Sequence, residues 1–75
     1  MRYHLNLRDD VQLIADAEGE EFANLEAARA EARASVRELV IEDLRNGKPS
    51  HGWRVEISND RGMVLDSIGL RFLEN

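Results

Sequence analysis

One helix pattern, over residues 24–47, constrains the fold of this chain more than any other feature. Most of its residues are Ala, Leu, Glu and Arg, which are among the strongest helix formers. Asn24 suits the N-cap, because its side-chain oxygen can accept a hydrogen bond from an unpaired amide of the first turn. Arg45 suits the negative end of the helix dipole, and Gly47 can take the left-handed conformation that ends many helices. The pattern predicts one helix over about residues 24–46.

The predicted helix has an apolar stripe and, on the opposite side, a line of small residues. At about 100° per residue the stripe contains Leu25, Ala28, Ala32, Val36, Leu39 and Val40. Alanines in its first half predict a close approach to the layer beneath. The opposite line contains Ala23, Ala27, Ala30, Ala34 and Ile41. The simpler interpretation is that these alanines are exposed helix formers, and the alternative is that they pack against a second helix in a homodimer.

Three arginines, Arg29, Arg33 and Arg37, recur at every fourth residue and form a basic ridge beside the stripe. Like charges at this spacing destabilise a helix by about 0.2–0.5 kcal/mol per pair. We therefore expect the ridge to pair with acidic residues nearby, such as Asp9, Asp10 or the acidic segment 16–21. The alternative is an anionic partner, including the acidic segment of a second copy.

The residues before the helix predict a hairpin. Residues 2–8 alternate, with Tyr3, Leu5 and Leu7 on one face and polar residues on the other, as in a half-buried strand. Asp9 and Asp10 suit a turn, and residues 11–15 would then return as the second strand.

The residues after the helix predict a second hairpin. Residues 53–58 place Trp53, Val55 and Ile57 on one face, and residues 59–62 suit a turn. Residues 63–72 form the last predicted strand, in which Asp66 breaks the apolar alternation. A bulge near Asp66 or Gly69 would reconcile the pattern. The order ββαββ predicts one α+β domain over residues 1–75, a four-stranded antiparallel sheet with the helix on one face.

Composition limits the functional classes. The 75 residues include no Cys, which excludes disulfides and thiolate metal sites. No apolar run approaches the roughly 20 residues needed to span a bilayer, and no signal segment precedes the first strand. We therefore expect a cytoplasmic protein. The net charge is −5, concentrated in an acidic N-terminal third that repels phosphate backbones and suits a basic protein partner better than nucleic acid.

Three segments carry a family resemblance: MRYHLNLRDD, DAEGEEFANLEAARAEA and GWRVEISNDRG. Together they resemble a family of small bacterial proteins of unknown function, whose members open with a strand like RYYFHLRDG and continue with a DLEAAR-type helix. The resemblance implies no catalytic residues. This chain departs from the family pattern at Asp9 and Asp10, where the family has a Gly-containing turn. The first half is also similar to HicB-type antitoxin domains, which implies a regulator that masks a small basic toxin or contacts nucleic acid through an assembled dimer.

Candidate chemistry is sparse. His4 and His51 lie on separate predicted elements without metal-ligand spacing, and Ser35 has no base nearby in the sequence. The glycines are isolated, so there is no phosphate-binding loop. Segment 16–21 lacks the spacing of a calcium loop. We expect no enzyme activity, no cofactor and no metal.

The sequence thus predicts a non-enzymatic protein-interaction module, most simply a homodimer. The alternative is an antitoxin-like regulator that binds a basic partner. The candidate partner-binding residues are Arg29, Arg33, Arg37, Ala30, Ala34, Glu18, Glu20 and Glu21.

Overall fold

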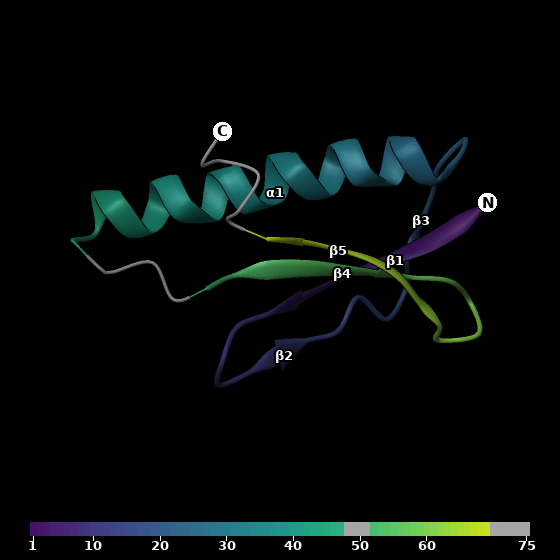
Figure 1. Cartoon of the computed structure of the whole chain (residues 1–75), viewed down its shortest axis with the longest axis horizontal. Coiled ribbons are helices and arrows are strands. Elements are labelled where there is room, and N and C mark those ends of the chain that lie inside the picture. Colours follow the sequence, from purple (N-terminus) through teal and green to yellow (C-terminus); the bar gives the residue numbers. More distant parts are fainter. Residues whose placement is uncertain (48–51, 70–75) are drawn as a thin grey trace.

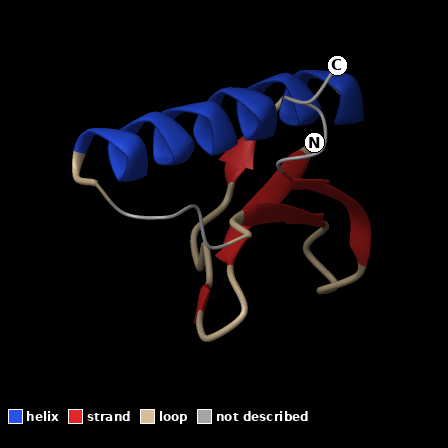
Figure 2. Cartoon of the chain, turned by 60° about the vertical axis from the view of Figure 1, so that its left-hand side comes forward, coloured by secondary structure: helices blue, strands red, loops and turns tan. Residues whose placement is uncertain are grey.

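A computed structural model describes residues 1–47 and 52–69, with one helix packed across one face of an antiparallel sheet (Figures 1 and 2). The elements in chain order are β1 (Arg2–Arg8), β2 (Leu13–Ile14), β3 (Glu20–Glu21), α1 (Leu25–Arg45), β4 (Arg54–Ser58) and β5 (Val64–Gly69). The strand order is β2-β1-β4-β5, and β3 also pairs with β1. The α+β class is confirmed, but the sheet has five strands where four were predicted.

Helix α1 begins and ends close to the predicted residues. The side chain of Asn24 accepts a hydrogen bond from the Ala27 amide at 2.9 Å, as expected of an N-cap. At the other end Gly47 has φ +68° and its amide donates to the Leu44 carbonyl at 3.2 Å. Local signals therefore determine both ends of the helix.

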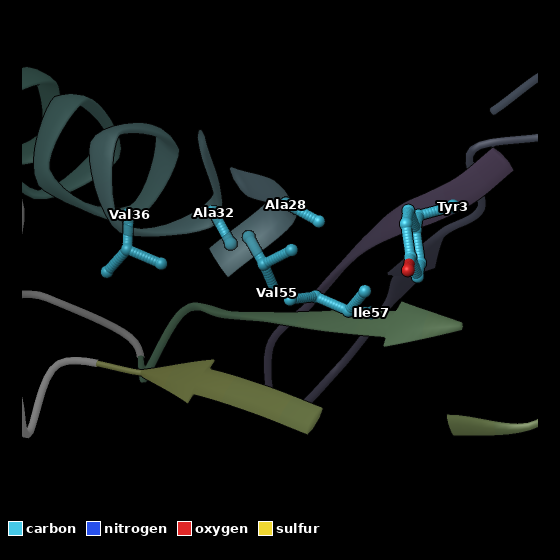
Figure 3. Packing of buried hydrophobic residues seen from close by; sticks show 6 residues of the cluster. All are labelled: Tyr3, Ala28, Ala32, Val36, Val55 and Ile57. Atoms are coloured by element: carbon cyan, nitrogen blue, oxygen red, sulfur yellow. The ribbon is translucent and has the colours of Figure 1, made fainter. Parts of the chain in front are cut away.

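The core lies between the predicted stripe of α1 and the middle of the sheet (Figure 3). Ala28, Ala32 and Val36 are fully buried, and they face Val55 and Ile57 of β4. Because an alanine side chain is a single methyl group, the first half of α1 can approach β4 closely. Tyr3 of β1 completes the buried cluster, which Leu25, Val40, Leu5, Leu7, Phe22 and Ile68 flank.

Trp53, predicted to share the inward face of β4, is only half-buried and is not a member of the buried cluster. The reason is its position, since β4 begins at the next residue, Arg54. His51, expected in a loop, and Leu70 and Phe72, expected in the last strand, lie outside the described residues.

The sheet edge that pairs with β1 is interrupted. It consists of two short strands, β2 and β3, where one strand was predicted. The predicted return strand over residues 11–15 is reduced to β2, and the chain pairs with β1 again only at β3. Between them the Asp16 carboxylate takes the place of a strand partner. It accepts hydrogen bonds from the amides of Leu5 and Gly19, both at 3.1 Å. The acidic segment 16–21 thus ends in a strand of the sheet edge, β3, and its first four residues connect β2 to it.

The second irregularity is a bulge between β4 and β5. Ile57 lies opposite Asp66, whereas Ser58 lies opposite Val64, so Leu65 is the extra residue. The bulge was predicted near Asp66 or Gly69 and lies one residue before Asp66. It places the Asp66 carboxylate on the helix-facing side of the sheet, where α1 supplies its partner.

Gly19 allows the interrupted edge to lie close to β1. Its φ is +71°, and a Cβ atom there would lie 3.0 Å from both the Tyr3 carbonyl oxygen and the His4 ring. Gly47 has nearly the same φ but no atom within 4 Å of the corresponding position, so it is a matched control. We expect Gly47→Ala to cost about 1 kcal/mol of unfolding free energy from backbone strain alone.

Gly19→Ala should cost at least about 1 kcal/mol more than Gly47→Ala, because the added methyl group also meets backbone that cannot move freely. Urea denaturation followed by circular dichroism, at one fixed protein concentration, measures both variants. Equal losses of unfolding free energy in the two variants would mean that the close approach at Gly19 does not add to the cost of the substitution.

Candidate functional site

The arginine ridge is partly neutralised within the molecule. Arg29 Nε donates to Asp66 Oδ2 of β5 at 2.6 Å, and its Nη1 donates to Glu26 at 3.2 Å. Arg33 also donates to Glu26, at 3.3 Å. The predicted pairing of the ridge with nearby acidic residues is confirmed for Arg29 and Arg33, but the acids suggested, Asp9, Asp10 and segment 16–21, were not the right ones. The ridge lies on the β5 side of α1, whereas segment 16–21 lies beyond β1 at the other edge.

These contacts change the acidity of the groups involved. The Arg29 guanidinium, followed by the Ser67 amide, lowers the pKa of Asp66 below its ordinary value of 3.8. Hydrogen bonds from Arg29 and Arg33 likewise lower the pKa of Glu26. Because the first two charges of the ridge already have carboxylate partners, the ridge is a weaker candidate for binding an anionic partner than the sequence suggested.

The acidic residues Glu18, Glu20 and Glu21 are exposed at the edge formed by β3. Glu21 lies 3.1 Å from the amino group of Met1 and 3.9 Å from Arg2. The Arg2 guanidinium also donates to the Glu18 carbonyl at 2.8 Å. These contacts hold the first residues of β1 in place. The acidic residues of this edge do not lie beside Arg29 and Arg33.

The outer face of α1 is the side turned away from the sheet, and we define it by Ala27, Ala30, Ala34, Ile41 and Leu44. Ala30 is exposed, Ala34 is half-exposed, and Ile41 and Leu44 expose 42% and 67% of their surface. The prediction named Ala30 and Ala34 but missed Leu44. The spacing in the sequence could have identified Leu44, because Leu44 follows Ile41 by three residues as Ala30 follows Ala27.

The face of the sheet opposite α1 carries a polar network centred on His4. The His4 ring lies 2.7 Å from the Asp16 carbonyl and 3.0 Å from Asp60 Oδ1. Asn6 links the same region by donating to Ser58 Oγ at 3.0 Å. Both ring nitrogens of His4 face acceptors, which favours the protonated ring. Its pKa is therefore raised above 6.5, first by the Asp16 carbonyl and then by Asp60.

A shallow hollow of about 310 Å³ lies over this network, with the side chains of Leu13 and Val64 on its rim. The polar groups at its floor bond one another, so they stabilise the sheet and are not arranged around a reacting atom. In residues 1–47 and 52–69, no three His, Cys, Asp or Glu side chains are grouped to hold a metal ion.

A second hollow, of about 450 Å³, lies between the C-terminal half of α1 and the sheet. Its apolar lining comes from Leu5, Leu7, Leu39 and Val55, and its polar lining from Ser35, Glu38 and Glu42. Sequence reasoning missed it, because the gap depends on how the helix lies on the strands.

Comparison with known protein families identifies the chain. Residues 2–71 match the family described as Domain of unknown function (DUF6894). The chain belongs to this family. The resemblance to a small uncharacterised family is thereby confirmed, whereas no comparison shows the likeness to HicB-type antitoxins. Neither the curated proteins nor the solved structures give a match. Among the described residues of this DUF6894 member, no helix is both long and apolar enough to cross a membrane.

The ion pair between Arg29 and Asp66 gives a testable pH dependence. Its folded-state contribution is present above the ordinary pKa of Asp66, 3.8, and is lost as the pH falls through the lowered pKa of the folded state. We expect Arg29→Gln to lower the urea midpoint at pH 7. The difference from the natural chain should shrink as the pH falls below the ordinary pKa.

Arg33→Gln is the matched control, because within the described residues Arg33 forms its ion pair with the exposed Glu26. Its effect at pH 7 should be the smaller of the two. A loss in Arg29→Gln that is unchanged at acidic pH would contradict an electrostatic contribution from Asp66.

Proposed function

We propose that this chain is a homodimerisation module and that its contact surface is the outer face of α1. The observation that carries the proposal is the arrangement of side-chain size along this face. Its N-terminal half has only alanines, and its C-terminal half has the exposed Ile41 and Leu44. These residues follow the alternating spacing of three and four residues that is typical of a helix-pairing seam, with Arg37 at the position between Ala34 and Ile41.

Antiparallel pairing matches small side chains with large ones. With a two-fold axis near Ser35 and Val36, Ala27 lies opposite Leu44 of the second copy, Ala30 opposite Ile41, and Ala34 opposite Arg37. Each layer then has nearly the same total volume, which suits a constant distance of about 8–10 Å between the helix axes. Parallel pairing would place small against small at one end and large against large at the other, so the helices would diverge.

The energy for pairing comes from apolar groups that the isolated chain leaves in water. Burial of a fully exposed Leu or Ile side chain contributes about 1.5–3 kcal/mol. Ile41 and Leu44 can contribute in proportion to their exposed 42% and 67%, and the two-fold axis doubles each contribution. A chain of 75 residues buries a small core and has no disulfides to reinforce it. Dimerisation is a common way for such a domain to gain stability.

Charges at the edge of the face oppose antiparallel pairing slightly. Glu31 would lie near Glu38 of the second copy, at a cost of about 0.2–0.5 kcal/mol per pair. Because both side chains are exposed, salt screens this repulsion. In a parallel pair, Glu38 would instead lie beside Arg33, so Glu38→Lys should tighten an antiparallel dimer and weaken a parallel one.

Cysteine cross-linking tests both the contact and its direction, because the chain has no native cysteine. In the antiparallel pair the double variant Ala30→Cys with Ile41→Cys should form an interchain disulfide on mild oxidation. Ala30→Cys alone should not, since its two copies would be about 16 Å apart along the helix axis. Rapid cross-linking of the single variant would indicate parallel pairing.

Ala30→Glu tests the proposal without cysteine chemistry. A carboxylate at this seam position would be buried against Ile41 of the second copy, so the variant should remain folded and elute as a monomer. Ala17→Glu adds the same charge at an exposed position near β3 and should remain dimeric. The same oligomeric state in the natural chain and both variants would contradict the proposed contact surface.

A further inference from the structure

We infer that the hollow between the C-terminal half of α1 and the sheet binds a small amphipathic cation, such as an organic amine with an apolar chain. The apolar part would lie against Leu5, Leu7, Leu39 and Val55, and the ammonium group would lie at Glu38 and Glu42. Its volume of about 450 Å³ falls in the range of small-molecule sites, about 300–1,000 Å³.

The hollow follows from how α1 lies on the sheet. The helix packs mainly on β4 and β5, and the methyl groups of Ala28 and Ala32 hold its first half close to β4. Leu5 and Leu7 of β1 point to the same side but are only half-buried. Their exposed surface, together with half-buried Leu39, gives the hollow its apolar wall.

The mouth of the hollow is negative. Glu38 and Glu42 are one helical turn apart, so they repel each other, and both are exposed. Within the described part of the chain, no ion pair neutralises either carboxylate, whereas Glu26 on the other flank has two arginine partners. Among residues 1–47 and 52–69, no Lys or Arg lines the hollow.

Two further features favour a cation here. Glu42 lies in the last turn of α1, where the negative end of the helix dipole attracts positive charge. The Ser35 hydroxyl, also in the lining, can accept a hydrogen bond from an ammonium group. A neutral apolar molecule would use only the wall, and an anion would be repelled at the mouth.

The hollow and the outer face lie on different sides of α1 and share Glu38 at their border, and this inference does not rest on dimerisation because the hollow is formed by one chain alone. Glu38 and Glu42 border the hollow, whereas Ile41 and Leu44 belong to the outer face. A chain that stays monomeric should bind the amine as well as a dimer does.

Three probes with the same eight-carbon chain separate the contributions: octylammonium, octanol and octanoate, each below its aggregation concentration at neutral pH. Methyl NMR follows Leu5, Leu7, Leu39 and Val55 during each titration. We expect saturable shifts with octylammonium, roughly three- to tenfold weaker binding of octanol, and the weakest binding with octanoate. Equal binding of octylammonium and octanoate, or shifts that do not involve these four residues, would overturn the inference.

Variants test the two parts of the site separately. Glu38→Gln with Glu42→Gln should reduce octylammonium affinity to that of octanol and leave octanol binding unchanged. Glu31→Gln, an exposed glutamate that does not line the hollow, is the matched control and should have no effect. Ser35→Leu should fill the hollow and weaken both probes. Unchanged octylammonium binding in either the double variant or Ser35→Leu would refute the assignment.

Discussion

The close contact of Ala28 and Ala32 with β4 determines most of this structure. Their methyl groups let the first half of α1 lie close against Val55 and Ile57. That contact places the helix over β4 and β5, leaves Leu5 and Leu7 partly uncovered, and turns the outer face of α1 away from the sheet. Both proposed binding surfaces are consequences of this one contact.

The sheet is shaped by side chains that replace regular strand pairing. Asp16 occupies the gap between β2 and β3, where its carboxylate accepts from the Leu5 amide. The bulge at Leu65 turns Asp66 towards α1, where Arg29 binds it. In both places a carboxylate meets a donor that lies far away in the sequence, and this fixes the edges of a small fold.

Features that depend on neighbouring residues could be predicted from the sequence. The ends of α1 follow from Asn24 and Gly47, and its buried side follows from the spacing of Ala28, Ala32 and Val36. The polar and apolar faces of β1 follow from simple alternation. The class of the fold then follows from the order of these elements, and the family match agrees with the segments that suggested it.

Features that depend on strand order could not be predicted. The order places segment 16–21 at one edge and Asp66 near the other, so Arg29 meets Asp66 and not the acidic segment. The role of Asp16 and the hollow beneath α1 likewise depend on distances between elements. Of the candidate site, Ala30 and Ala34 were identified from spacing and the same spacing marks Leu44, whereas Glu38 and Glu42 required the structure.

The central claim is that α1 uses one face for the core and the opposite face for a second copy of the chain. Sedimentation equilibrium of the natural chain in the tens of micromolar range tests this most directly. We predict a mass twice that of the 8.5 kDa chain, with an association that strengthens as salt is added. A mass that stays at 8.5 kDa across that range would contradict the account.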